Sequence, residues 1–334
     1  MPITINNAAD TAMTRSVRAG ISPGYLRDRR NRGSARRRAR LETVAKRTSH
    51  RIVIPGAGGM VGRVLAAQGR LQGGDVLALT SSQCDITDPA AVARVIAPGD
   101  VVINCAAYTK VDAAEADPER AQAVNATGPG NLARACATAG ARLIHISTDY
   151  VFSGTQRRPY EIDDETGPLS VYGRTKLAGE RAVLEVMPDA HVVRTSWVYE
   201  GGDGGDFVAV MRRRAAGDQP VEAVADQVGS PTYAGDLVAA LLEVADGDID
   251  APVLHAANEG EASRFEQAQA VFEAVGADPA RVRPVGSDQH PRPAPRPAYS
   301  ALSGRRSAAA GLTPLRPWRD ALTWALGEHG VAAR

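Results

Sequence analysis

Tyr172 and Lys176 stand four residues apart in the segment YGRTK, a spacing that places two side chains on one face of a helix. A free tyrosine has a pKa of about 10, which is too high for ready proton exchange near neutral pH. An adjacent ammonium group favours the phenolate and lowers that pKa, so that the tyrosine becomes a usable general acid. The pair therefore predicts proton transfer, with an exposed helix pair as the alternative for so short a pattern.

A second polar set closes the apolar segment RLIHIST, which reads as a strand over residues 142–148. Thr148 ends that segment, and Asp149 follows it directly. Open α/β sheets bind their ligands at the carboxyl ends of the strands. We therefore expect the Thr148 hydroxyl to polarise a substrate carbonyl there.

The segment GAGGMVG carries glycines at positions 56, 59 and 62, after the first apolar strand and at the start of a helical pattern. Glycine permits a tight turn and a close approach of the backbone to a pyrophosphate, whose charge then lies at a helix N-terminus. Gly56, Gly59 and Gly62 therefore predict a dinucleotide site, and an ordinary strand-to-helix turn is the alternative.

The end of the second strand bears on the choice of cofactor. Residues 80–82 read TSS, where an NAD-specific protein usually places Asp or Glu for the ribose hydroxyls. The missing carboxylate removes repulsion against a 2′-phosphate, and Arg63 is near in sequence, so we expect NADPH, with NADH as the alternative. Asp85 and Ile86 are expected beside the adenine, although this segment also reads as a helix-capping loop.

Apolar runs and helical patterns alternate from residue 51 onward, which is typical of a parallel sheet covered by helices on both faces. The fold class we predict is α/β, a Rossmann-type doubly wound parallel sheet with a smaller C-terminal substrate-binding lobe. Residues 51–200 are expected to form the nucleotide-binding domain. Residues 201–334 are expected to form mainly the lobe, partly interleaved with the first domain. The expected strands are 51–57, 75–80, 101–107, 142–148 and 191–199, and the expected helices include 118–139, interrupted at 128–130 (GPG).

Charge and composition exclude several classes of protein. The 334 residues have a formal net charge of +1, yet residues 1–50 hold 12 Lys and Arg against 3 Asp and Glu. This Arg-rich extension predicts disorder, and its charge run over residues 27–40 has no aromatics or motif, so we expect no nucleic-acid partner. The sequence has no run of about 18 apolar residues, so we predict no membrane span. Three cysteines at unrelated spacings predict neither disulfides nor a metal site, which favours the cytoplasm. The acidic residues of 161–165 read as a solvated loop.

Several longer segments carry a family resemblance across residues 51 to 325. The chain resembles the extended short-chain dehydrogenase/reductases and, within them, the dTDP-4-dehydrorhamnose reductase family. The matching segments, in family order, are GAGGMVG, NCAAYTKVDAAEADPERAQAVNATG, STDYVFSG, PLSVYGRTKLAGE, RTSWVY, DQVGSPTYAGDL and RPAYSAL.

The resemblance implies a role for each matching position. Tyr172 would donate the proton. Lys176 would activate Tyr172 and contact the nicotinamide ribose. Thr148 would bind the keto oxygen, and Asp149 and Trp197 would contact the sugar. The implied pyrophosphate loop contains Gly59, Met60 and Val61, and the implied cofactor stretch after the third strand contains Ala107, Tyr108 and Thr109.

The implied activity is NADPH-dependent reduction of a 4-keto sugar nucleotide to dTDP-L-rhamnose, on the way to rhamnose-containing cell-envelope polymers. Related dehydratases carry Asp-Glu after the Thr, because elimination needs a second acid/base pair, whereas Asp149 is followed here by Tyr150. Two alternatives stay open: a non-catalytic NADP-binding regulatory subunit, and a reductase of another 4-keto-deoxysugar nucleotide. Monomer and homodimer are both open.

Overall fold

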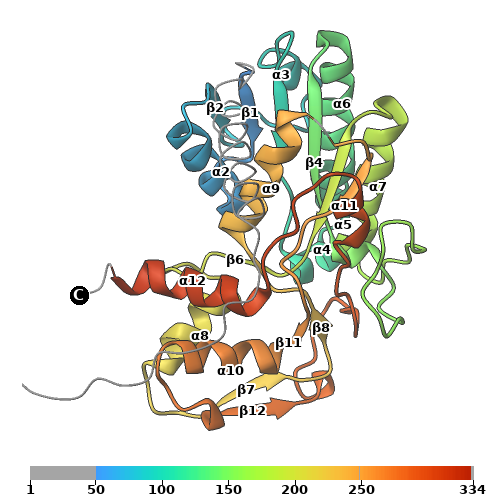
Figure 1. Cartoon of the computed structure of the whole chain (residues 1–334). Helices are drawn as coiled ribbons and strands as arrows, with labels where there is room; N and C mark the ends of the chain where they lie inside the picture. The colour runs from blue at the N-terminus through green and yellow to red at the C-terminus, as the bar shows by residue number, and fades with distance from the viewer. Residues whose placement is uncertain (1–49, 248, 332–334) are drawn as a thin grey trace, which may run out of the picture. The chain divides into compact units, whose positions relative to one another are not determined.

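The computed structural model describes residues 50–247 and 249–331, so the prediction of disorder for residues 1–50 falls almost wholly outside the described residues. Six parallel strands form the central sheet in the order β10-β5-β4-β3-β1-β2 (Figure 1). Their apolar residues form strands because a parallel sheet covered on both faces buries every side chain. The strands are β1 (Ile52–Pro55), β2 (Val76–Leu79), β3 (Val101–Asn104), β4 (Arg142–Thr148), β5 (His191–Thr195) and β10 (Val253–His255).

Helices cover both faces of this sheet, which confirms the predicted fold class. Val53 and Ile54 on β1 point to opposite faces and join two separate apolar cores. One core is closed by α2 (Met60–Leu71) and α9 (Ala234–Asp246). The other is closed by α3 (Pro89–Ala93), α6 (Gly128–Ala139) and α7 (Val171–Val186).

The last third of the chain contributes to the sheet as well as to a smaller lobe. Helix α9 and strand β10 belong to the sheet layers, whereas a third apolar core lies in the lower part of Figure 1. The lobe contains α8 (Phe207–Ala215), β7 (Val221–Val224), α10 (Arg264–Ala274), β12 (Val282–Val285) and α12 (Trp318–Val331). Short strands join the two parts: β6 (Val198–Tyr199) pairs with β9 (Thr232–Tyr233), and β8 (Val228–Gly229) pairs with β11 (Ala262–Ser263).

The helical region before β4 differs from the prediction at the Gly-Pro-Gly sequence. After α4 (Val111–Ala116), α5 (Pro118–Gln122) runs through a π-helical turn over residues 123–127 directly into α6. Pro129 lies in the first turn of α6, where a missing N–H costs little, so the helix is not interrupted. Gly128 is required by packing, because a Cβ there would lie 2.5 Å from the Ile86 side chain.

No helix among the described residues, 50–247 and 249–331, is long and apolar enough to cross a bilayer. The three cysteines, Cys84, Cys105 and Cys136, are all unpaired thiols. Burial raises the pKa of the Cys105 and Cys136 thiols to about 12. Both are therefore inert packing residues at neutral pH.

Candidate active site

A cavity of about 370 Å³ lies where the carboxyl ends of β1, β3, β4 and β5 meet. The chain runs from β1 outward to β2 and then crosses back to β3 on the other side, so the cavity is at the topological switch point of the sheet. The cavity brings together many of the residues expected at the site: Gly59, Met60, Val61, Ala107, Thr109, Thr148, Asp149, Tyr172, Lys176 and Trp197. Sequence reasoning missed eight further lining residues: Asn104, Cys105, Ala106, Ile146, Ser147, Thr195, Ser196 and Val198.

The glycine loop has the shape that a pyrophosphate requires. Gly59 is the N-cap of α2, and no side chain caps the helix or places an acid in its first turn. A Cβ at Gly62 would lie 2.4 Å from the Gly56 carbonyl oxygen, and Gly56 itself has a φ of 81°. Free amides at an uncapped helix N-terminus attract an anion, so this loop fits a dinucleotide cofactor.

Five of the residues expected to bind the cofactor do not line the cavity: Gly56, Gly62, Asp85, Ile86 and Tyr108. The two glycines act through the shape of the loop. Tyr108 is held through its backbone by Asn125, whose side chain accepts from its N–H at 2.8 Å and donates to its carbonyl at 3.1 Å.

The segment expected beside the adenine lies just before α3, whose N-cap is Asp88. The Asp85 carboxylate accepts hydrogen bonds from the backbone and the hydroxyl of Thr87, at 2.9 and 2.8 Å. Ile86 is buried in the core. Arg63, which the sequence offered for a 2′-phosphate, is paired instead with Glu200 at 2.9 Å.

Tyr172 lies at the start of α7, where the chain packs closely against the segment after β4. Ser170 caps the helix by accepting from the Gly173 N–H at 3.1 Å, and the Tyr172 ring meets the Tyr150 ring edge to face at 5.7 Å. Burial raises the pKa of Tyr172, Asp149 and Tyr150 raise it further, and a hydrogen bond with Thr148 opposes these effects. The expected lowering of this pKa by Lys176 is not seen, since Lys176 is not among the groups that shift the pKa of Tyr172.

Lys176 explains that difference, because its ammonium group is held against the sheet. Its Nζ donates to the Ile146 carbonyl at 2.6 Å and lies 3.4 Å from His145 Nε2. Burial lowers the pKa of Lys176 to about 8, although the Glu180 carboxylate opposes the shift. Burial also holds the pKa of His145 well below its usual value, so this core histidine is neutral.

Asp149 is turned into the protein and is only 2% exposed. Its carboxylate accepts from the hydroxyls of Thr148, Ser196 and Ser300, at 3.0, 3.0 and 2.6 Å. Burial raises the pKa of this carboxyl group, and the three hydroxyls oppose that shift. The Thr148 hydroxyl donates to Asp149, and Tyr172 is its other side-chain partner.

The expected strand over residues 191–199 breaks at Trp197. This residue has a φ of 46°, the left-handed region that non-glycine residues rarely adopt, and it separates β5 from β6. Backbone strain of this kind persists where the surrounding structure enforces it, and it concentrates at functional sites. The break places the indole in the wall of the cavity.

A buried ion pair supports the floor of the site. Arg194 on β5 makes two hydrogen bonds to Glu180 on α7, at 2.7 and 2.9 Å, and Ser147 donates to the same carboxylate at 2.5 Å. Arg194 also donates to the Ile162 carbonyl at 3.1 Å. The ion pair thereby connects the residue before Thr148 to the loop of residues 153–166.

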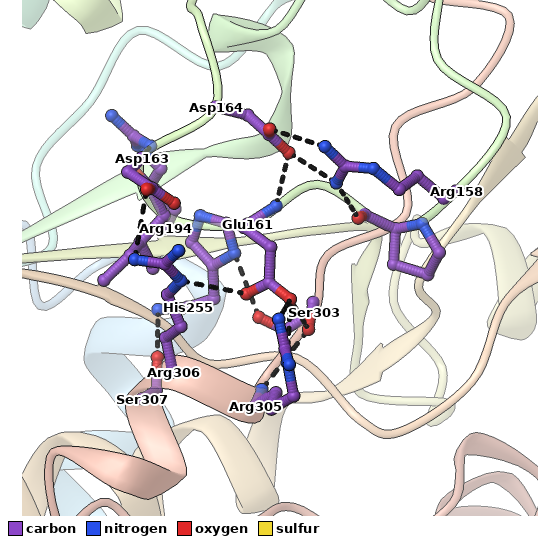
Figure 2. A network of polar contacts seen from close by, with 12 residues as sticks. Arg158, Glu161, Asp163, Asp164, Arg194, His255, Ser303, Arg305, Arg306 and Ser307 are labelled. Atoms are coloured by element: carbon purple, nitrogen blue, oxygen red, sulfur yellow. Dashed lines mark hydrogen bonds and ion pairs between the residues drawn. The ribbon is translucent and has the colours of Figure 1, made fainter.

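That loop is tied to the C-terminal segment by the charged network that Figure 2 shows. Asp164 pairs with Arg158 at 2.8 Å, Glu161 with Arg305 at 3.0 Å and Asp163 with Arg306 at 3.0 Å. Glu161 and Asp163 thus connect this loop to residues 305–306 through arginines, whereas Asp164 pairs within the loop.

The sheet and its switch-point cavity define the class of the molecule: a Rossmann-fold, nucleotide-binding protein. The chain belongs to the RmlD substrate-binding domain family, whose model matches residues 50–330. The resemblance seen in the sequence is thereby confirmed.

Two mycobacterial reductases share well over half of their sequence with this chain. The chain is 69% identical over 304 residues to dTDP-4-dehydrorhamnose reductase of Mycolicibacterium smegmatis, covering 91% of this chain and 92% of that protein. It is 65% identical over 282 residues to dTDP-4-dehydrorhamnose reductase of Mycobacterium tuberculosis, covering 83% and 93%. Among solved structures, dTDP-4-dehydrorhamnose reductase of Bacillus anthracis in complex with NADP superposes with a TM-score of 0.79 at 33% identity, covering 84% and 100%.

Proposed function

We propose that this chain reduces the C4 ketone of dTDP-4-dehydro-L-rhamnose with NADPH, giving dTDP-L-rhamnose in the last step of dTDP-rhamnose biosynthesis. The observation that carries the proposal is the meeting of Thr148, Tyr172 and Lys176 in one cavity beside the glycine loop. The names of the two mycobacterial relatives and the NADP complex of the Bacillus anthracis enzyme support the substrate and the cofactor.

The protein's part in this reaction is to place and move one proton. The bound cofactor supplies a hydride to the ketone carbon, and Tyr172 gives its proton to the oxygen on which negative charge develops. Burial keeps Tyr172 protonated in the resting site, so the proton is in place before the ketone arrives. Positioning in a closed cavity supplies much of the remaining acceleration.

The other site residues bind and orient. Gly59, Met60 and Val61 would hold the pyrophosphate at the N-terminus of α2, and Ala107 and Thr109 would run along the cofactor. In a separate role, the ammonium group of Lys176 would leave its backbone partner to contact the nicotinamide ribose. Asp149 and Trp197 would border the sugar.

Tyr150 distinguishes reduction from elimination at this site. A dehydratase of this fold needs a second carboxylate after Asp149, but the position is filled by a tyrosine whose ring packs on Tyr172. Reduction needs only one proton and one hydride, which matches the groups present. The free thiols favour a reducing compartment, and we place the reaction in the cytoplasm.

The test is cofactor oxidation by the purified protein, followed by absorbance, with dTDP-4-dehydro-6-deoxyglucose and a 3,5-epimerase supplied. NADPH and NADH are run in parallel, and Tyr172→Phe is run beside the wild type. We expect turnover that requires the epimerase and falls by about 10²- to 10⁴-fold in the variant. Retained NADPH binding without turnover would contradict the proposal and favour a regulatory subunit. Turnover without the epimerase would identify another keto sugar as the substrate.

A further inference from the structure

Arg264 is a half-buried cation at the first position of α10, in the C-terminal lobe. Its guanidinium lies flat on Trp197, with Cζ 3.5 Å from the ring centroid, and 4.9 Å from the ring centroid of Phe207. Its guanidinium donates a hydrogen bond to Gln267 at 3.0 Å. No carboxylate of the described residues lies within ion-pair distance of Arg264.

The carboxylates that could balance this charge are already engaged. Asp149 is close enough to influence Arg264, yet its oxygens are occupied by three hydroxyls. Asp112 is bound by Arg296, whose positive charge also acts on Arg264. Burial lowers the pKa of Arg264 to about 10, which reflects the cost of a desolvated guanidinium. A partly desolvated charge without an ion-pair partner is costly unless an anion completes it.

The lobe holds Arg264 against the cavity wall through Trp197. Pairing of β8 with β11 sets Gly229 opposite Ala262, two residues before Arg264. A Cβ at Gly229 would lie 2.4 Å from the indole of Trp197, so the indole packs on Gly229 as well as on Arg264. The free N–H groups of Arg264 are thus fixed beside the residue that we place at the sugar.

We propose that Arg264 binds the diphosphate of the nucleotide-sugar substrate, which runs from the cavity past Trp197 towards α10. A guanidinium offers paired donors that match phosphate oxygens. The inference rests on the proposed function, since it takes its ligand from that substrate. The stack on Trp197 also makes the indole a reporter of diphosphate binding.

The experiment measures the affinity of the full chain for thymidine, dTMP and dTDP by calorimetry, together with tryptophan fluorescence. Arg264→Gln removes the charge but keeps a planar side chain, and Arg264→Lys keeps the charge without the planar fork. Arg319→Gln is the matched control, because Arg319 contacts Trp318 in the same lobe, and Trp318 does not line the cavity whereas Trp197 does. NADPH affinity reports that each variant is folded.

We expect Arg264→Gln to weaken dTDP binding by about tenfold or more and to leave thymidine binding within about twofold. The dTDP affinity of Arg264→Lys should lie between those of the wild type and Arg264→Gln, and that of Arg319→Gln should match the wild type. The dTDP-dependent fluorescence change should disappear in Arg264→Gln, and Trp197→Phe should assign that change to the indole.

Equal preference for dTDP over thymidine in the wild type and in Arg264→Gln would overturn this inference and leave the proposed function standing. Equal loss of thymidine and dTDP binding would also overturn it, because Arg264 would then shape the lobe and not recognise the diphosphate. A wild type that binds no dTDP would overturn both proposals. If Arg264→Gln fails to bind NADPH, Arg264→Lys decides the question through the same comparison.

Discussion

The hydroxyl of Thr148 donates to the carboxylate of its neighbour Asp149 at 3.0 Å, inside a cluster in which two more hydroxyls donate to the same group. The Thr148 oxygen also accepts from the Tyr150 N–H at 3.2 Å. Tyr172 is the other side-chain partner of Thr148, so the buried anion lies one residue away from the proton donor along this chain of hydrogen bonds. Asp149 therefore sets the direction of the hydroxyl that contacts Tyr172.

Asp149→Asn should lower kcat by about tenfold to a hundredfold, which corresponds to the about 1.5–3 kcal/mol typical of a hydrogen bond to a charged group. The amide must donate where the carboxylate accepted, so one of the three hydroxyls turns away. Steady-state kinetics and NADPH affinity provide the measurement. Ser300→Ala removes one hydroxyl and leaves the direction of Thr148 intact, so its effect on kcat should be smaller. An Asp149→Asn variant with wild-type kcat would show that the direction is irrelevant.

Lys176 should make cofactor binding depend on pH. Its pKa of about 8 leaves it charged below that pH and neutral above it. Contact with the ribose favours the charged form, so NADPH binding should take up a proton above about pH 8, and affinity should fall as the pH rises through this value. Calorimetry in buffers of different ionisation enthalpy measures the uptake. Lys176→Met should abolish it, and proton uptake that persists in this variant would assign the titration to another group.

Gly62→Ala should weaken NADPH binding by about tenfold or more and destabilise the cofactor-free protein by about 1–3 kcal/mol. The new Cβ would lie 2.4 Å from the Gly56 carbonyl oxygen, so the phosphate loop must move. Gly58→Ala is the control for stability, because its nearest neighbour would be Thr80 Cγ2 at 3.9 Å. Thermal unfolding without cofactor and NADPH titration provide the two readouts. An unfolding temperature for Gly62→Ala equal to that of Gly58→Ala would contradict the close contact.

Arg194→Met should destabilise the fold by about 3–5 kcal/mol, because it leaves the Glu180 carboxylate buried without its partner. The two side chains are 6% and 4% exposed. The double variant Arg194→Met with Glu180→Leu should lose less than the sum of the single effects. Urea unfolding measures each change.

The control for that prediction is the surface pair of Arg158 with Asp164. Arg158 is 57% exposed, and solvent-exposed pairs of this kind contribute little to stability. Arg158→Gln should therefore leave the urea midpoint nearly unchanged. If Arg158→Gln and Arg194→Met lowered the free energy of unfolding equally, burial would not explain the effect of Arg194.

The sheet could be predicted from the sequence because each parallel strand is a short apolar run with no competing pattern. β4 matches the prediction over residues 142–148 because Thr148 ends the apolar run at the sheet edge. The Gly-Pro-Gly at 128–130 does not interrupt the helix as the sequence predicts, because a proline is tolerated in the first turn of α6. The strand expected over 191–199 ends early, because packing of Trp197 against the lobe enforces a backbone that no local pattern indicates.

The sequence by itself determined the fold class, the family and the gathering of Thr148, Tyr172 and Lys176, since local spacing and strand order suffice to bring strand ends and one helix face together. Tertiary structure alone decided the electrostatics. The pKa of Tyr172 depends on burial, and the state of Asp149 depends on Ser300, which is 151 residues away in the chain. Arg264 lies against Trp197 because β8 pairs with β11, which no local pattern indicates. Burial and long-range contact carry no periodic signal along a chain, so they become visible only when it folds.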